Sequence, residues 1–337
     1  SACLVGSEMC IRDRNKVDHI KYADSVYDFY ELGIGAPVAL SAEQGLGIGD
    51  LLDEVVSYFE KNPEDEHPEV TNIAVVGKPN VGKSSLVNAL LGQERTIVSD
   101  IAGTTRDAID TPFTYGGRDY MLVDTAGIRR KRAIEDESIE RYSVIRSLGA
   151  IRRADVVLIV IDAEEGLSEQ DVRIAGYVHE EGKASVLIVN KWDLIEKDTH
   201  TMNEFKKKLS ADLAFMDYVP MLFISALSGQ RVGKVMEQAD FAYAQNCLRV
   251  STGTLNDIVS EAVMVTEPPS DKGRRLKIYY ATQVSVKPPT FVLFVNEPEL
   301  MHFSYKRYME NYIRKSFGLT ATPIRLLVRQ RTKNAPL

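Results

Sequence analysis

Short, continuous runs of apolar residues alternate with amphipathic stretches through the middle of the chain. The runs are rich in Val, Ile and Leu and occupy residues 73–76, 121–123, 156–161, 184–189 and 221–224. Runs this short and this uniformly apolar are typical of strands buried on both faces of a mostly parallel sheet. Since helical stretches separate them, the pattern predicts an α/β fold with helices on both sides of the sheet, a three-layer α/β/α domain.

The pattern changes from about residue 249. It predicts a helix, two strands, a basic helix and a last strand, at residues 254–265, 276–286, 290–295, 304–317 and 323–328. Tyr305, Tyr308 and Tyr312 follow helical spacing, so we expect their rings to pack in a core or an interface rather than to stack on bases. The α-β-β-α-β order predicts a second, smaller α+β domain.

The strand at 73–76 leads directly into a glycine-containing loop. The loop and the start of the next helix read Gly77, Lys78, Pro79, Asn80, Val81, Gly82, Lys83, Ser84 and Ser85. A strand, G-x-x-x-x-G-K-S and a helix together form the phosphate-binding loop (P-loop). The glycines let backbone N–H groups point inward at the phosphates, and the helix N-terminus adds partial positive charge. We expect Lys83 to reach the β- and γ-phosphates and the Ser84 hydroxyl to bind Mg²⁺.

A second motif follows the run at 184–189 and reads Asn190, Lys191, Trp192 and Asp193. A carboxylate such as that of Asp193 accepts hydrogen bonds from the N1–H and exocyclic amine of guanine, and adenine offers no such pair of donors. We expect Asn190 to bond the other edge of the base and the Lys191 stem to lie along its face. After the run at 221–224, backbone groups are expected to close the guanine pocket at Ser225, Ala226 and Leu227.

Two stretches between these motifs have the character of nucleotide-dependent switches. The run at 121–123 delivers Asp124, which is followed by Thr125, Ala126, Gly127 and Ile128. We expect Asp124 to hold Mg²⁺ through water and the Gly127 N–H to bond the γ-phosphate, so that hydrolysis releases this segment. Upstream, residues 101–107 supply hydroxyls, with Thr105 as the expected Mg²⁺ ligand and Thr104 as the alternative. Five elements in this order predict a GTPase of P-loop NTPase fold whose catalytic residues are Lys83, Thr105, Asp124 and Gly127.

These motifs closely resemble those of one family. The sequences Gly-Lys-Pro-Asn-Val-Gly-Lys-Ser, Gly-Thr-Thr-Arg-Asp, Asp-Thr-Ala-Gly-Ile-Arg-Arg-Lys and Asn-Lys-Trp-Asp are similar to those of the second GTPase domain of the Der (EngA) family, bacterial GTPases with two tandem Era-like domains. Residues 71–248 resemble that domain, and residues 249–337 resemble the KH-like domain that ends the family's chains. The resemblance implies a switch that binds GTP and GDP and assists ribosome biogenesis, in particular assembly of the large (50S) subunit, with ribosomal RNA as a partner.

The resemblance also bears on hydrolysis. Ile128 stands where Ras-like enzymes carry a glutamine that orients water. GTPases with these switch sequences commonly bind K⁺ beside the phosphates, where it substitutes for an arginine finger. The resemblance implies Asn80 as the side-chain ligand of K⁺, with backbone oxygens from residues 99–104. We therefore predict slow turnover that is faster in K⁺ than in Na⁺.

A second guanine-type motif near the start of the chain reads Asn15, Lys16, Val17 and Asp18. The motif is followed by a helix, a strand, Ser-Ala and a glycine turn, and the same order recurs after Asn190. This recurrence is an internal tandem repeat, and its first copy is similar to the end of the first Der domain. Residues 15–59 are therefore expected to be the remnant of a first GTPase domain in a truncated chain, without a P-loop and unable to bind GTP tightly. Residues 1–14 do not fit that fold and are expected to be non-native, and residues 60–70 read as an acidic linker.

The formal charge of −7 is distributed unevenly over the 337 residues. Residues 250–337 hold 13 Lys and Arg against 7 Asp and Glu, whereas the rest of the chain holds 28 against 41. Such segregation favours a polyanion as partner of the C-terminal domain. That domain lacks the Gly-x-x-Gly clamp of KH modules, so its basic charge serves either ribosomal RNA or packing against a GTPase domain. Likewise, residues 129–132 (Arg-Arg-Lys-Arg) either contact RNA or form a solvated switch segment.

Three scattered cysteines indicate a reducing cytoplasm, and no apolar run approaches the ~20 residues that span a membrane. We expect a cytoplasmic monomer with neither DNA nor a membrane as partner. His179, near a helix end, is expected to be exposed and inert. Two other functions stay open: an RNA-binding protein whose GTP site is mainly structural, and a tRNA-modification GTPase with the same switch sequences. The tandem repeat and the KH-like tail argue against the latter.

Overall fold

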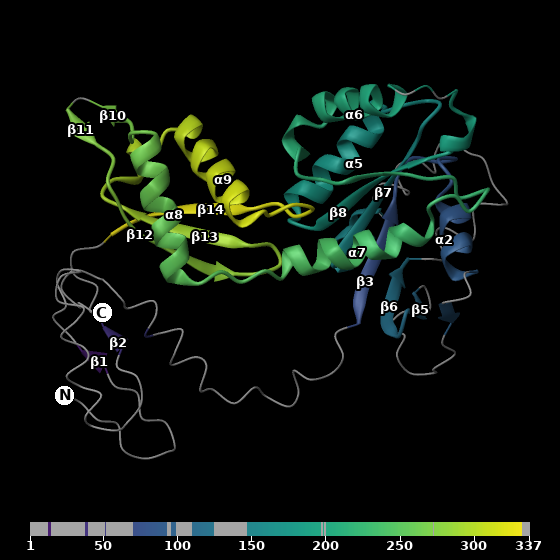
Figure 1. Cartoon of the computed structure of the whole chain (residues 1–337), viewed down its shortest axis with the longest axis horizontal. Helices are drawn as coiled ribbons and strands as arrows, with labels where there is room; N and C mark the ends of the chain where they lie inside the picture. Colours follow the sequence, from purple (N-terminus) through teal and green to yellow (C-terminus); the bar gives the residue numbers. More distant parts are fainter. Residues whose placement is uncertain are drawn as a thin grey trace, which may run out of the picture.

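The computed structural model describes residues 70–92, 96–98, 110–124, 147–196, 198, 200–271 and 273–331, with short pieces at 13–14, 38–39 and 51. Within this part of the chain, helix α7 (Gly233–Asn246) leads from an α/β domain to a smaller α+β domain (Figure 1). Ahead of both, β1 (Asp13–Arg14) and β2 (Val38–Ala39) pair in parallel. Among the described helices, none combines the length and the apolar character that a bilayer crossing requires.

A seven-stranded sheet forms the centre of the α/β domain, in the order β4-β5-β6-β3-β7-β8-β9. Its strands are β3 (Thr71–Val76), β4 (Thr96–Val98), β5 (Thr111–Tyr115), β6 (Arg118–Val123), β7 (Val156–Asp162), β8 (Ala184–Asn190) and β9 (Met221–Phe223). The five apolar runs are the five parallel strands, with β3 between β6 and β7. Every residue of β7 and β8 is buried, as expected for strands covered on both faces.

The antiparallel edge formed by β4 and β5 was not among the predicted strands. β4 has only three residues, and β5 contains two threonines and a proline instead of an apolar run. The hairpin between β5 and β6 turns at Gly116 and Gly117, whose φ values are 58° and 83°. Positive φ at both central residues is the type I′ geometry that matches the twist of paired strands. The Gly-Gly pair is thus the sequence signal for this edge.

Helices cover both faces of the sheet. On one face α2 (Lys83–Leu91) and α7 share a core with the strands, and on the other α5 (Glu169–Glu180) and α6 (Thr201–Asp212) do so. Within β3, Ile73 and Val75 belong to the first core, whereas Ala74 and Val76 belong to the second. This alternation follows from the two-residue repeat of a strand. The predicted three-layer α/β/α domain is confirmed.

The second domain packs two helices on a three-stranded sheet. Its elements are α8 (Thr252–Val265), β10 (Ser270–Asp271), β11 (Arg274–Arg275), β12 (Ile278–Ser285), β13 (Thr290–Val295), η6 (Pro298–Leu300), α9 (Phe303–Phe317) and β14 (Arg325–Gln330). β13 lies between an antiparallel β12 and a parallel β14. The hydroxyls of Tyr305 and Tyr308 donate to backbone carbonyls of the α8 segment at 3.0 and 2.8 Å. These tyrosines therefore join α9 to α8, in agreement with the core role expected from their spacing.

The loop before β14 docks the second domain on the first. Ala321 is fully buried in the core of the α/β domain. Its N–H donates to the Tyr218 carbonyl at 2.8 Å, and its own carbonyl accepts from the Ser185 N–H at 2.8 Å. The Thr322 hydroxyl donates to Asn246 Oδ1 at 2.8 Å. The C-terminal domain thus packs against the α/β domain, which is one of the two roles that its composition left open.

The expectation that His179 is exposed was wrong. Its ring is only partly accessible, and Nδ1 lies 2.9 Å from the Tyr218 hydroxyl. Burial lowers the pKa of His179, and the nearby positive charge of Arg314 lowers it further. Arg314 belongs to α9, far away in sequence, so the local pattern around a helix end gave no sign of this environment.

Candidate functional site

The predicted site residues lie at the carboxyl ends of the parallel strands. The P-loop follows β3, Asp124 follows β6, the Asn190 motif begins at the end of β8 and Ser225 follows β9. Parallel strands end at the same edge of a sheet, so these segments meet there although they are far apart in sequence. The first βα turn at this edge is the place where α/β sheets bind nucleotides.

The P-loop can wind as tightly as it does only with glycine at two positions. At Gly77 (φ 147°) an added Cβ would lie 2.2 Å from the Val160 carbonyl oxygen. At Gly82 (φ 94°) it would lie 2.2 Å from Asn190 Nδ2. Both φ values also belong to a region that other residues rarely adopt. The glycines of the motif are therefore required by the neighbouring β7 and β8 segments as well as by the loop itself.

Lys83, the first residue of α2, places its ammonium group against the P-loop. Its Nζ donates to the carbonyl oxygens of Gly77 and Lys78, at 2.7 and 2.5 Å. These bonds fix a positive charge where the loop and the helix N-terminus meet, the position at which a P-loop lysine neutralises phosphate charge. Ser84 and Ser85 follow in the first turn of the helix and are exposed.

Asn190 connects two parts of the site through its side-chain amide. Its side chain is only 2% exposed. Nδ2 donates to the Val81 carbonyl at 2.8 Å, and Oδ1 accepts from the Ala226 N–H at 2.9 Å. The amide thus ties the P-loop to the Ser225–Ala226 segment. These bonds satisfy buried backbone groups on either side, and they use one of the two N–H donors of Nδ2, so the expected bond to the base edge stays a prediction.

Lys191 follows in a left-handed conformation (φ 60°) and pairs with a buried carboxylate. Its Nζ lies 2.5 Å from Asp162, the last residue of β7. Burial alone would raise the pKa of Asp162, but the hydrogen bond from Lys191 and those from backbone N–H groups outweigh it and lower that pKa. Asp162 therefore fixes the Lys191 stem at the mouth of the predicted guanine pocket.

The last two residues of this motif have opposite environments. Trp192 is 3% exposed and packs edge-on against Phe205 and Phe223, so its side chain anchors the motif in the core rather than contacting nucleotide. Asp193 is exposed in the short helix η4 (Trp192–Leu194), where its carboxylate is accessible to a ligand. Leu227 is 89% exposed, so any closure of the pocket here comes from its backbone.

Asp124 stands at the end of β6 with positive φ (58°), and a residue absent from the sequence prediction supports it. Its N–H donates to Asp110 Oδ1 at 2.9 Å, and the other carboxylate oxygen of Asp110 pairs with Arg153. Three groups of predicted residues lie outside the described residues. The switch residues are 99–107, with Thr104 and Thr105, and Thr125, Ala126, Gly127 and Ile128. The other two groups are the basic segment 129–132 and the remnant motif Asn15, Lys16, Val17 and Asp18.

A second link between the P-loop and the rest of the domain was also missed. Lys78 Nζ lies 2.5 Å from Glu165 and 3.8 Å from the buried Asp171. Burial alone would lower the pKa of Lys78, but the hydrogen bond to Glu165 and the charges of Asp171 and Glu165 outweigh it and raise that pKa. Asp171 also forms a capping box with Ser168 at the start of α5. The Ser-x-x-Asp spacing is the sequence signal that predicts this cap.

The donor set fits a hard divalent cation. Ser84 lies in the first turn of α2, after β3, and Asp124 directly follows the neighbouring β6. Hydroxyl and carboxylate oxygens, with water, are the ligands that Mg²⁺ prefers beside nucleotide phosphates. Asn80, the predicted K⁺ ligand, is exposed in the P-loop with φ 65°, so its amide oxygen is accessible to a cation.

Comparison with known proteins shows which family the chain resembles. A family profile described as "50S ribosome-binding GTPase" matches residues 72–191, and one described as "KH-domain-like of EngA bacterial GTPase enzymes, C-terminal" matches residues 249–329. A protein named GTPase Der from Alkaliphilus oremlandii is 58% identical over 321 residues, covering 94% of this chain and 72% of that protein. The chain belongs to the Der family of GTPases. Another Der protein, from Pelotomaculum thermopropionicum, is 59% identical over 322 residues, covering 95% of this chain and 73% of that protein.

Membership of the Der family confirms the P-loop GTPase fold and the KH-like domain predicted from the sequence. It also confirms a guanine nucleotide as the ligand class of the family and ribosome binding as a family property. Among solved structures, Era in complex with MgGDPNP and nucleotides of 16S ribosomal RNA is 22% identical and covers 79% of this chain and 95% of that chain, with a TM-score of 0.40.

Proposed function

We propose that this Der-family chain is a GTP-hydrolysing switch that assists assembly of the 50S ribosomal subunit. In this proposal residues 71–248 form the GTPase domain and residues 249–337 the KH-like domain. The family profile described as a 50S ribosome-binding GTPase supports the ribosomal part of this proposal. The observation that carries the nucleotide-binding part is the buried amide of Asn190, which joins the P-loop at Val81 to the Ser225–Ala226 segment at Ala226. A phosphate site and a guanine site held together in this way make one nucleotide pocket.

Each group in the pocket has a separate task. Asp193 accepts hydrogen bonds from guanine, and Lys191, fixed by Asp162, lies along the base. The P-loop N–H groups and Lys83 hold the phosphates. Ser84, Asp124 and Thr105 would hold Mg²⁺, which, when bound, offsets the charge that develops on the phosphates during transfer.

K⁺ is proposed to replace the missing catalytic glutamine. Ile128 cannot polarise water, so another group has to stabilise the transition state, and Asn80 offers an accessible amide oxygen beside the phosphates. We expect turnover in K⁺ to exceed turnover in Na⁺ at equal ionic strength, with Asn80→Leu removing the difference. The measurement is phosphate release in matched KCl and NaCl buffers, and equal wild-type rates in the two salts would exclude this role of K⁺.

Helix α5 contacts the P-loop at one end and the KH-like domain at the other. Its first turn holds Asp171, which contacts Lys78 of the P-loop. At its last turn the Glu180 carbonyl accepts a hydrogen bond from Arg325 of β14, at 3.2 Å. Because a helix is stiff, a shift of the P-loop on nucleotide exchange would be transmitted along α5 to the domain contact. The proposal is therefore that GTP and GDP change how the KH-like domain docks.

The experiment that tests the function is co-sedimentation of the chain with purified 50S and 30S subunits in GDP or a non-hydrolysable GTP analogue. We expect retention on 50S subunits, stronger with the analogue than with GDP, and little retention on 30S subunits. Equal retention in both nucleotides would contradict a switch and favour an RNA-binding protein with a structural GTP site. Absence of 50S binding in both would contradict the ribosomal role.

A further inference from the structure

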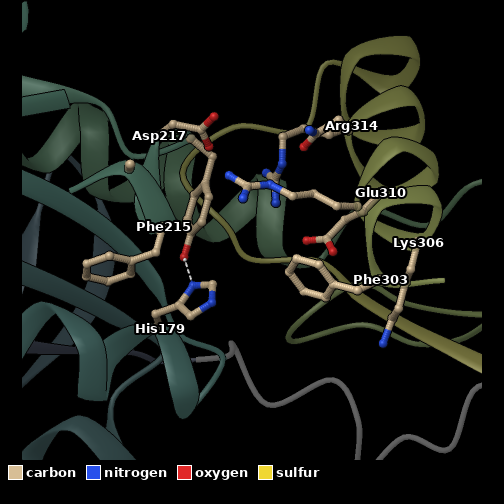
Figure 2. A pocket seen from close by; sticks show the side chains of 11 residues that line it. His179, Phe215, Asp217, Phe303, Lys306, Glu310 and Arg314 are labelled. Carbon is tan, nitrogen blue, oxygen red and sulfur yellow. Dashed lines mark hydrogen bonds between the residues drawn. The ribbon is translucent and has the colours of Figure 1, made fainter. Parts of the chain in front are cut away.

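A pocket lies where the KH-like domain meets the GTPase domain (Figure 2). Its walls come from three segments: the end of α5 with His179, the segment around η5 (Ala214–Met216), and the outer face of α9. Its volume is about 280 Å³, close to the lower end of known small-molecule sites, ~300–1,000 Å³. It is remote from the P-loop, since His179 lies at the opposite end of α5 from Asp171.

Two phenylalanines from different domains line this pocket. Phe215 of η5 is 39% exposed, and Phe303 at the start of α9 is 73% exposed. Figure 2 shows the Phe303 ring directed into the pocket, whereas the Phe215 ring lies on the far side of His179, against which it packs edge-on at 5.8 Å between ring centres. Flat aromatic faces left accessible at a pocket are what an unstacked base needs, because every base can stack on a π-face regardless of sequence.

The polar groups divide the pocket into a cationic rim and a polar interior. Lys306 and Arg307 lie in the first two turns of α9, where the helix N-terminus adds partial positive charge. Asp217 and Glu310 supply carboxylates, and Figure 2 shows Glu310 directed inward from α9. Phosphates suit the rim, whereas a carboxylate accepts hydrogen bonds from exocyclic amines of bases.

Arg314 belongs to the wall and not to the binding groups. It donates to the carbonyl oxygens of Leu319 and Thr322, at 2.9 and 2.8 Å, and its guanidinium lies 4.5 Å from the centre of the Tyr218 ring. These contacts hold α9 at a fixed distance from η5. The distance between the two phenylalanine walls is therefore set by the docking of the domains.

We propose that this junction pocket receives one unstacked, amine-bearing base of single-stranded RNA, stacked on Phe303, with flanking phosphates on Lys306 and Arg307. The inference rests on the proposed function, since it names a contact that a ribosome-binding GTPase would make with RNA. RNA fits better than an acidic peptide because a stacking face and paired cations are present. The excess of Lys and Arg over Asp and Glu in residues 250–337 points the same way.

The test is a fluorescence titration of the full chain with a ten-nucleotide oligoadenylate that carries 2-aminopurine at its centre. Stacking quenches this base, so we expect quenching on binding and about 10-fold weaker binding in Phe303→Ala. Phe215→Ala should show a smaller loss, because the Phe215 ring supports His179 in the pocket wall. Phe241→Ala is the matched control, because Phe241 is 43% exposed on α7 and does not line the pocket. Oligouridylate, which has no exocyclic amine, should compete less well than oligoadenylate.

Charge is tested in the same assay. Lys306→Ala should reduce the slope of log affinity against log salt by about 0.7, whereas the two pocket phenylalanine variants should leave the slope unchanged. Lys315→Ala, on the same helix but outside the pocket, should change the slope less than Lys306→Ala. Equal binding of wild type, Phe303→Ala and Phe215→Ala would overturn the inference, and so would the absence of quenching in the wild type.

Failure of this site can be told from failure of the proposed function. Wild type and Phe303→Ala are sedimented with 50S subunits in parallel with the titration. Equal retention of both proteins on 50S subunits, with no effect on the oligonucleotide, would overturn the pocket and leave the ribosomal role standing. Loss of retention in Phe303→Ala, with GTP-analogue affinity unchanged, would support the pocket on its natural partner.

Discussion

The nucleotide site and the junction pocket are built in opposite ways. The nucleotide site lies within one domain, and its critical parts are backbone groups, glycines and a buried amide at Asn190. The junction pocket takes its walls from two domains and its binding groups from side chains that are exposed or half-buried, such as Phe303 and Lys306. In the described part of the first site these contacts form within one domain, whereas the second site exists only while the two domains stay docked.

This difference decides how each site responds to substitution. Loss of a buried group in the nucleotide site, such as the Asn190 amide, leaves buried partners unsatisfied, so binding and folding suffer together. Loss of an exposed side chain in the junction pocket removes a contact with little effect on folding. The expected effects of substitution therefore decrease from the first site to the second.

The largest effect is expected for Asp193→Asn. The carboxamide presents a donor where guanine also presents donors, so GTP affinity should fall about 10⁴-fold, in the range for sites built around a hydrogen-bonded group. Xanthosine triphosphate, which carries a carbonyl in place of the amine, should gain affinity. Competition against a fluorescent GDP analogue measures both changes, and unaltered GTP affinity would mean that Asp193 does not face the base.

A large effect is also expected for Gly82→Ala. The new Cβ would lie 2.2 Å from Asn190 Nδ2 at a φ of 94°, so the amide has to move and its bonds to Val81 and Ala226 break. We expect a loss of about 2–4 kcal/mol in the free energy of unfolding and a fall in GTP affinity. Urea unfolding measures the first quantity.

Gly176→Ala is the control for this substitution. Gly176 lies within α5, and an added Cβ would meet nothing within 4 Å. Alanine should therefore stabilise the helix by about 0.5–1 kcal/mol. Similar stability changes in both variants would contradict the close approach of Gly82 to Asn190.

At the junction, Arg314→Met should cost about 2–3 kcal/mol, because two carbonyl acceptors lose a charged donor. We expect the domains to undock more easily, so that RNA binding in the pocket falls although no binding group has changed. Unfolding of the KH-like domain and the oligoadenylate titration give the two readouts. Arg329→Met, on exposed β14, is the control and should leave both unchanged.

The smallest effect concerns pH at the junction. Burial, with the charge of Arg314, lowers the pKa of His179 in the folded protein below its ordinary value of 6.5. As pH falls below 6.5, the unfolded chain therefore binds a proton at His179 more readily than the folded protein does. The contribution of neutral His179 to the free energy of unfolding is fully present above pH 6.5 and is lost as pH falls below it. His179→Gln should show a weaker loss between pH 7 and 5 in urea unfolding. Identical pH profiles of the two proteins would contradict a lowered pKa of His179, because they would mean that the folded and unfolded states bind its proton equally.

The sequence predicted most of the fold and the nucleotide motifs, because those features depend on local order. A buried parallel strand needs an apolar run, and a tight phosphate loop needs Gly77 and Gly82 at fixed spacing. Strand β5, between β4 and β6, was missed because its sequence mixes threonines and a proline with aromatic residues and forms no apolar run. The surroundings of His179, the contacts of the Asn190 side chain and the junction pocket were not predicted, because each depends on residues far away in sequence. These residues are Arg314, Val81 and Phe303, respectively. Only the fold brings these groups together.

The central claim is that one nucleotide site forms from the P-loop and the Asn190–Asp193 motif. Calorimetric titration with a non-hydrolysable GTP analogue in excess ATP tests it directly. We expect one site per chain, unaffected by ATP and lost in Lys83→Ala. Two sites per chain, or binding that survives Lys83→Ala, would contradict the claim.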